Sequence, residues 1–273
     1  MEVAAFLPPL LLSHLRIVVG HDHSLLAVDS WTALTEVVRR SIVDVLVVDP
    51  AADGTARSVE IATLLQRFPS VPVVLYMTLA PSTLRAVVSL GRFQLDQVVL
   101  YRFDDEPRRF RELIERQPGN TVGEAVLRRL GPALALVDAR LAEAVERLFR
   151  QPQQFTTVHD LARDAGLMMR AVYRQCERAG LASPRMLVMG ARLTRAYVFM
   201  RDPGYTIEDV TIKMGYSAPR MFARHMKVAT GWLPSEVRAS VTAAQLVERL
   251  VDALYPTERA AAPRSSTGAA HEA

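Results

Sequence analysis

Two segments of the C-terminal half repeat one pattern: TTVHDLARDAGLMMRAVYRQCERAG at 156–180 and YTIEDVTIKMGYSAPRMFARHMKVATG at 205–231. In each, a threonine precedes an aspartate by three residues, which is the spacing of a capping box at a helix start. The pairs are Thr157 with Asp160 and Thr206 with Asp209. Each short helix then reaches a glycine, Gly166 or Gly215, which tolerates the left-handed conformation of a sharp turn. Because a second helical run follows each glycine, the repeat predicts two helix-turn-helix units.

A single long helix is predicted between the two units, in SPRMLVMGARLTRAYVFMRDPG at 183–204. Ser183 and Pro184 are favoured at the N-cap and the first helical position, and Pro203-Gly204 ends the run. A helix of about 18 residues is roughly 27 Å long. That length is of the right order to place two units in successive major grooves of DNA.

Basic residues are concentrated around the repeat. Residues 156–240 hold thirteen Lys and Arg against seven Asp and Glu, a net charge of +6, and the whole chain carries only +4. Arg170, Arg174 and Arg178 recur every four residues and therefore share one helical stripe, although like charges at that spacing repel. A basic half beside a mildly acidic remainder is the electrostatic footprint of a nucleic-acid-binding domain.

The N-terminal half alternates short apolar, β-branched runs with helix-like segments, which predicts a parallel α/β sheet. The expected strands are nearly all apolar, as in a sheet covered on both faces. They lie at 3–6, 16–20, 43–49, 71–77 and 96–101. The helical segments between and after them lie at 30–40, 56–68, 81–93 and 104–116. The fold class expected here is a five-strand, receiver-like or flavodoxin-like domain.

The remaining segments divide the chain into four parts. TVGE at 121–124 reads as a capping box, and Gly131-Pro132 is expected to break the helix that it starts. From Asp138 onward the pattern is helical, and the small, polar end of the chain predicts a disordered tail. The expected parts are an α/β domain at 1–117, a helical connector at 118–137, an all-α DNA-binding domain at 138–240, and a helix with a tail at 241–273.

Composition excludes several classes of protein. The single cysteine, Cys176, rules out an internal disulfide framework and indicates a reducing cytoplasm. No apolar run approaches the ~20 residues of a membrane span. The residues His21, Asp22 and His23 lack a fourth ligand at usable spacing, so we interpret them as loop residues. With no phosphate loop and no nucleophile–base pair, we expect neither an enzyme nor a metal or cofactor.

The segment RLTRAYVFMRDPGYTIEDVTIKMGYSAPRMFARHMKVATGWLPSEVR at 192–238 resembles the AraC/XylS family of bacterial transcription regulators, and the resemblance extends over roughly 138–240. It implies a sequence-specific regulator that binds double-stranded DNA, with a homodimer and RNA polymerase as further partners. The base-facing positions carried over from the family are Arg170, Tyr173 and Arg174 in the first unit, and Arg220, Ala223 and Arg224 in the second.

Arginine chemistry supports this assignment independently, because two parallel donors match guanine O6 and N7 in the major groove. Lys227 is better suited to a phosphate, and Arg178 and Ser217 are also expected to contact the DNA backbone. Ser217 is further expected to cap the second recognition helix. Met168 and Met169 stand at the start of the first recognition helix, where the family usually has a small cap.

The N-terminal half resembles the receiver domain of response regulators, in which Asp49 would be the phosphate acceptor and Thr78 the neighbouring hydroxyl. The acidic residues that a magnesium site needs after the first strand are missing, and Tyr101 and Arg102 stand where a lysine is expected. We therefore predict a pseudo-receiver that dimerises or senses by other means. Two alternatives stay open: a regulator phosphorylated on Asp49, and a protein-interaction adaptor whose units no longer bind DNA.

Overall fold

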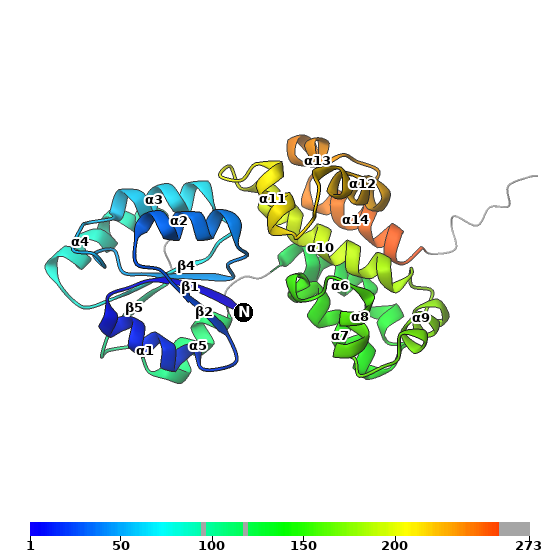
Figure 1. Ribbon diagram of the computed structural model, residues 1–273, viewed down its shortest axis with the longest axis horizontal. Coiled ribbons are helices and arrows are strands. Elements are labelled where there is room, and N and C mark those ends of the chain that lie inside the picture. The colour runs from blue at the N-terminus through cyan, green and yellow to red at the C-terminus, as the bar shows by residue number, and fades with distance from the viewer. Residues whose placement is uncertain (94–96, 117–119, 257–273) are drawn as a thin grey trace, which may run out of the picture.

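The computed structural model describes residues 1–93, 97–116 and 120–256, in an N-terminal α/β domain followed by an all-α domain (Figure 1). Five strands form one sheet in the order β2-β1-β3-β4-β5, and every neighbouring pair is parallel. They are β1 (Glu2–Phe6), β2 (Ser24–Ala27), β3 (Val45–Val48), β4 (Val73–Met77) and β5 (Val98–Leu100). This is the flavodoxin-like doubly wound order. The predicted fold class is confirmed.

Helices cover both faces of the sheet (Figure 1). On one face lie α1 (Pro9–Val19) and α5 (Pro107–Glu115), and on the other α2 (Trp31–Arg40), α3 (Ser58–Arg67) and α4 (Pro81–Leu90). Successive strand residues point to opposite faces. Val45 and Val47 thus pack with α1 and α5, whereas Leu46 and Val48 pack with α2 and α3. Burial on both faces explains why the strand sequences are almost wholly apolar.

One predicted strand is wrong. Residues 16–20 belong to α1 and its C-terminal cap, and the second strand is β2 at Ser24–Ala27. Pro9 occupies the first turn of α1, where its missing N–H costs nothing. Leu11, Leu15 and Val18 then recur at the spacing of one helical face and are buried against the sheet.

The C-terminal domain consists of helices joined by short turns. They are α6 (Thr121–Leu134), α7 (Ala139–Arg150), α8 (Val158–Asp164), α9 (Met169–Arg178), α10 (Pro184–Arg201), α11 (Ile207–Lys213), α12 (Pro219–Thr230), α13 (Pro234–Ser240) and α14 (Ala243–Leu254). The predicted units are α8 with α9 and α11 with α12, and the predicted 18-residue helix between them is α10, capped by the Ser183 hydroxyl. The predicted tail from 257 lies outside the described residues.

The expected connector differs from the prediction in two ways. Its N-cap is Asn120 rather than Thr121, and the Asn120 side chain accepts from the Gly123 N–H at 3.1 Å. The helix also continues through Gly131 and Pro132 to Leu134. The missing N–H of the proline costs one hydrogen bond, but α6 packs against α7, α10 and α14, and that burial outweighs the local break.

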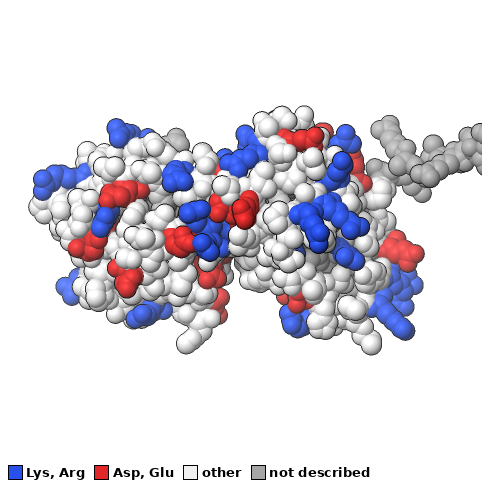
Figure 2. Space-filling view, turned by 45° about the horizontal axis from the view of Figure 1, so that its top comes forward, with Lys and Arg blue, Asp and Glu red and all other residues white. Residues whose placement is uncertain are grey.

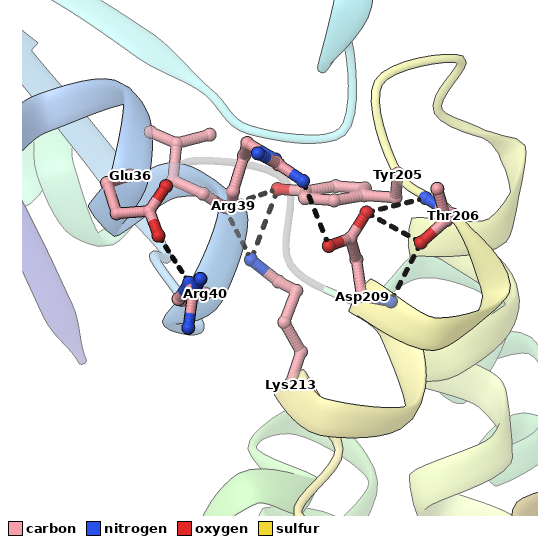
Figure 3. Close-up of polar contacts among 8 residues, drawn as sticks. Glu36, Arg39, Arg40, Tyr205, Thr206, Asp209 and Lys213 are labelled. Carbon is pink, nitrogen blue, oxygen red and sulfur yellow. Dashed lines mark hydrogen bonds and ion pairs between the residues drawn. The ribbon is translucent and has the colours of Figure 1, made fainter. Parts of the chain in front are cut away.

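The two domains are docked through α11 and the C-terminal end of α2 (Figure 3). The buried Lys213 ammonium donates to the Val38 carbonyl at 2.7 Å, to the Ser41 carbonyl and to the Tyr205 hydroxyl at 3.2 Å. Tyr205 donates in turn to the Val38 carbonyl at 2.9 Å. Carbonyls at a helix C-terminus lack intrahelical partners, so Lys213 and Tyr205 cap α2 from the other domain.

Further contacts extend this docking surface. The Gly204 N–H donates to the Arg67 carbonyl at 2.7 Å, and the Phe68 and Tyr205 rings pack with centroids 4.7 Å apart. Asp202 accepts from the backbone N–H and the hydroxyl of Ser70 at 3.1 and 2.5 Å. Phe68, Asp202 and Tyr205 are buried here, and the two domains share one continuous hydrophobic cluster.

Buried charges accompany the docking. Arg195 is 4% exposed and pairs with Asp44 of the N-terminal domain at 3.3 Å. Burial raises the pKa of Asp202 to about 6, although the hydrogen bonds from Ser70 act to lower it. Burial lowers the pKa of Lys213 to about 7, and the nearby Arg195 acts in the same direction. These polar groups are compensated only while the domains stay together, because an unpaired buried charge is costly.

Candidate nucleic-acid interface

Reciprocal hydrogen bonds start the first helix of each unit. The Thr157 hydroxyl accepts from the Asp160 N–H, and the Asp160 carboxylate accepts from the Thr157 N–H at 2.9 Å. Burial raises the pKa of Asp160, but the bonds from Thr157 and Thr156 outweigh it and hold that pKa at about 2. Thr206 and Asp209 form the same box in the second unit, so both predicted capping boxes are confirmed.

A left-handed glycine makes the turn of each unit, as predicted. Gly166 has φ +61° and Gly215 has φ +66°. A side chain at either position would strain the backbone, because L-residues avoid this region. The glycines thus fix the angle at which α9 and α12 leave the preceding helix.

The first recognition helix, α9, separates apolar from basic residues. Val172 and Cys176 are buried in the domain core. Burial raises the pKa of Cys176 to about 11, so the thiol stays neutral and packs as a small apolar group. Arg170, Tyr173 and Arg174 are exposed on another side of the helix, and Tyr173 is 44% exposed. Arg178 is exposed at the last turn.

The second recognition helix, α12, has the same arrangement. Phe222 and Met226 are buried, and the Phe222 ring packs against Tyr216 with centroids 5.3 Å apart. The remaining face runs at i, i+3, i+4 and i+7, the spacing of one helical stripe. It carries the exposed Arg220, Arg224 and Lys227 and the half-buried Ala223.

The expected cap of α12 is wrong. The helix begins at Pro219, so Ala218 is its N-cap and provides no side-chain bond. Because proline is favoured at the first helical position, the helix starts one residue later than it would if Ser217 were its N-cap. Ser217 lies exposed just before the cap. In the first unit Met168 is the N-cap, also without a side-chain bond.

The basic groups of these helices have no acidic partners within the described part of the chain. No ion pair or hydrogen bond involves the side chain of any of six residues: Arg170, Arg174, Arg178, Arg220, Arg224 and Lys227. By contrast, Arg140, Arg147 and Arg163 of the same domain all pair with carboxylates. Figure 2 shows groups of Lys and Arg side chains over the C-terminal domain. Unpaired cations on the exposed faces of two helices form a surface suited to a polyanion.

Two basic residues near the second unit were not predicted from the sequence to belong to the site. Arg192 of α10 donates to the Met214 carbonyl and lies 4.6 Å from the Tyr216 ring centroid, so it braces the turn of the second unit. Arg185 is exposed at the start of α10. Burial lowers the pKa of His225 in α12, and the charges of Arg185, Arg192 and Arg224 add to this effect. Arg185 therefore contributes to the positive field beside α12, but no feature of the sequence distinguishes it from an ordinary surface arginine.

The two recognition faces differ in one charge. Fifty residues separate equivalent positions of the two recognition helices, so Glu177 in α9 stands where Lys227 stands in α12. Glu177 is exposed and lies on the stripe of Arg170, Tyr173 and Arg174. A carboxylate on this stripe opposes binding to phosphates.

We expect the Glu177→Lys variant to bind DNA more tightly than the parent chain and with a steeper salt dependence, by about one to two units of slope. Affinity measured by fluorescence anisotropy over a series of salt concentrations checks this. Glu248→Lys, on the exposed side of α14, makes the same charge change away from α9 and should leave the slope near that of the parent. An equal effect of both variants would contradict the placement of Glu177.

Asp49 follows β3 at the carboxyl edge of the sheet. It is 4% exposed, and its Oδ1 accepts from the Ala51 N–H at 2.8 Å. Burial raises the pKa of Asp49, against the lowering effect of the Ala51 bond. Among the described residues no group of three His, Cys, Asp or Glu side chains could hold a metal ion. A carboxyl shielded in this way is poorly accessible to a phosphoryl donor.

We expect no mass gain when the chain is incubated with acetyl phosphate and Mg²⁺, because Asp49 is shielded and no group of three metal-ligating side chains lies among the described residues. Intact-mass spectrometry measures the outcome, and the Asp49→Asn variant should be indistinguishable from the parent. A gain of one phosphoryl group that disappears in Asp49→Asn would support the phosphorylation alternative instead.

Comparisons with known proteins agree with the helical geometry. A family model described as a helix-turn-helix domain matches residues 161–240, which include both recognition helices. The chain therefore carries a helix-turn-helix domain. No curated protein matches the chain in sequence. None of the described helices is long and apolar enough to cross a membrane.

Among solved structures, full-length FixJ from B. japonicum is similar, with a TM-score of 0.37 and 13% sequence identity over 82% of this chain and 94% of that chain. At this level of similarity, the fold assignment depends on the strand order and parallel pairing described above.

Proposed function

We propose that the chain is a sequence-specific bacterial transcription regulator of the AraC/XylS type. Its domain at 138–240 reads DNA with α9 and α12, and its receiver-like domain at 1–117 regulates or dimerises it. The observation that supports this best is the pair of exposed arginine faces, Arg170 with Arg174 and Arg220 with Arg224, free of ion pairs within the described residues. Such a regulator acts in the cytoplasm as a homodimer, with RNA polymerase as a further partner.

The division of labour within each face follows from side-chain chemistry. The four arginines present bidentate donors to guanine edges, Ala223 permits close approach to a thymine methyl, and Tyr173 contacts a base of the first half-site. Lys227, Arg178 and Ser217 contact phosphates, which fix the register without reading sequence. The 18 residues of α10 separate the two units by roughly 27 Å, close to one turn of DNA.

Selection of binding sites from a random double-stranded DNA library, followed by footprinting of the selected site, tests the proposal. We expect two protected blocks about one helical turn apart, and affinity that falls steeply with salt as counterions are released. Enrichment of no sequence would overturn it. Binding to proteins that is insensitive to salt, without DNA binding, would favour the adaptor alternative.

A further inference from the structure

A cleft of about 800 Å³ lies between the two domains. The N-terminal domain lines it with the start of β1, the α1–β2 loop and the α2–β3 loop, which together form the amino edge of the sheet. The C-terminal domain lines it with the segment before α8, with Arg192, and with the turn between α11 and α12. The cleft therefore lies at the opposite edge of the sheet from Asp49, and both helix-turn-helix units contribute to its wall.

Charges of both signs line this cleft. Arg40, Arg192 and Lys213 supply cations, and Glu2, Asp22 and Asp44 supply carboxylates. Asp22 lies near Arg111, Asp44 pairs with Arg195 and Arg40 pairs with Glu36. The Lys213 ammonium donates to the carbonyls of Val38 and Ser41. By contrast, no ion pair or hydrogen bond of the Glu2 carboxylate exists among the described residues. A ligand with a single charge would leave either the cations or the carboxylates of the cleft without an opposite charge, or facing a like charge. A ligand that carries a positive and a negative charge can contact both the carboxylates and the cations.

Unpaired acceptors in the same wall favour a ligand with hydrogen-bond donors. Gln153 Oε1 and His23 Nδ1 are buried without a partner in the described structure. His23 contacts the Glu115 carboxylate through Nε2 at 2.8 Å, which leaves Nδ1 as an acceptor when the ring is neutral. A buried polar atom without a partner destabilises the structure around it. Rotation of either side chain toward an ammonium or hydroxyl group in the cleft would remove that destabilisation.

We infer that this interdomain cleft binds a small zwitterion of the amino-acid class. Its ammonium group faces Glu2 and the acceptors of His23 and Gln153, and its carboxylate faces Arg192 and Arg40. The inference depends on the proposed function only for its consequence, the control of DNA binding, because ligand binding itself can be measured without DNA.

The position of the cleft explains how a ligand reaches the recognition helices. Arg192 lines the cleft and also holds the Met214 carbonyl at the turn into α12. On the other side, Thr156 lines the cleft and donates its hydroxyl to Asp160 of the first capping box at 2.9 Å. A ligand that contacts Arg192 and the segment before α8 therefore favours one relative placement of the two units. Ligand and DNA then change each other's affinity by the same factor.

Isothermal titration of the intact chain with each of the twenty standard L-amino acids tests the inference, together with thermal unfolding at the same ligand concentrations. We expect at least one amino acid to bind and to raise the unfolding temperature, because a ligand that binds only the folded state stabilises it. The N-acetyl and carboxamide derivatives of that amino acid, which each lack one charge, should bind at least tenfold more weakly.

Two variants locate the site. Glu2→Gln and Gln153→Leu should each weaken binding several-fold, whereas Glu248→Gln, an equivalent change on α14, should not. The inference is overturned if none of the twenty amino acids binds, or if binding survives both cleft variants unchanged. Loss of DNA binding with intact ligand binding would count against the proposed function alone. An operator affinity that does not respond to the bound ligand would overturn the regulatory consequence.

Discussion

The Arg220→Ala, Arg224→Ala double variant is expected to bind its selected DNA site at least about 30-fold more weakly than the parent chain and to lose base preference in one half-site. Each arginine that reads a guanine contributes about 1–3 kcal/mol, and every 1.4 kcal/mol is a tenfold change in affinity. Both side chains are exposed on the face of α12 opposite Phe222 and Met226, so their removal leaves the core intact. Competition binding with wild-type and single-base-substituted sites measures both effects.

A matched variant separates base reading from loss of charge. Arg85 lies on α4 and Arg116 at the end of α5, so both are exposed on the N-terminal domain and away from the recognition helices. Their double replacement by alanine removes the same two charges and should change affinity only slightly, with base preference preserved. If both double variants lose affinity equally, or if the α12 variant keeps its base preference, α12 does not read the site.

The two recognition helices, α9 and α12, differ in the charge of the exposed stripe and in the residue at the helix start. In α9 the acidic Glu177 shares the stripe of the arginines, and the exposed Met168 supplies the N-cap. In α12 the equivalent of Glu177 is Lys227, and Pro219 starts the helix with a fixed backbone angle. The second unit therefore presents the more favourable charge to DNA.

Local signals were sufficient for the helix-turn-helix units. Capping boxes and left-handed glycines act over three or four residues, so Thr206, Asp209 and Gly215 define their turn without help from the rest of the chain. The two outward faces follow from the same periodicity, because Phe222 and Met226 fix which side is buried.

Local signals failed where distant packing decides. The β-branched run at 16–20 has the composition of a strand, but the spacing of Leu11, Leu15 and Val18 against the sheet makes it helical. Pro132 would end an isolated helix, yet contacts of α6 with α7 and α14 carry the helix past it.

The docking of the two domains could not be predicted from the sequence at all. Lys213 looks like an ordinary lysine at a helix end, but its partners Val38 and Ser41 are 175 and 172 residues away. Gly204 looks like a helix stop, yet it also lies against Phe68 of the other domain. Such roles depend on the relative placement of the domains, which no local pattern encodes.

The Gly204→Ala variant is expected to loosen this docking and to lower the stability of the chain. A Cβ at Gly204 would lie 2.3 Å from Cε1 of Phe68 and 2.7 Å from the Arg67 carbonyl oxygen, closer than real Cβ atoms approach. The Arg67 carbonyl oxygen cannot move unless the C-terminal end of α3 moves with it. The two domains must therefore separate locally. Overpacking of this kind costs about 1–3 kcal/mol, and for a chain of this size each 1 kcal/mol lowers the unfolding temperature by roughly 2–4 °C.

Hydrogen exchange distinguishes loosened docking from local strain. When the interface opens, the carbonyls of Val38 and Ser41 lose the Lys213 ammonium, so exchange should accelerate at the C-terminal end of α2 and in α11. The Lys213→Met variant removes the ammonium but keeps the length of the side chain, and it should accelerate exchange in the same two segments.

Gly131→Ala is the control for these exchange measurements, because nothing lies within 4 Å of a Cβ added there and alanine favours the helix. It should leave exchange in α2 and α11 unchanged. A lower unfolding temperature in Gly204→Ala, with unchanged exchange in α2 and α11, would mean that the strain is absorbed within the segment after α10. In that case Gly204 would not hold the receiver-like domain against the second helix-turn-helix unit.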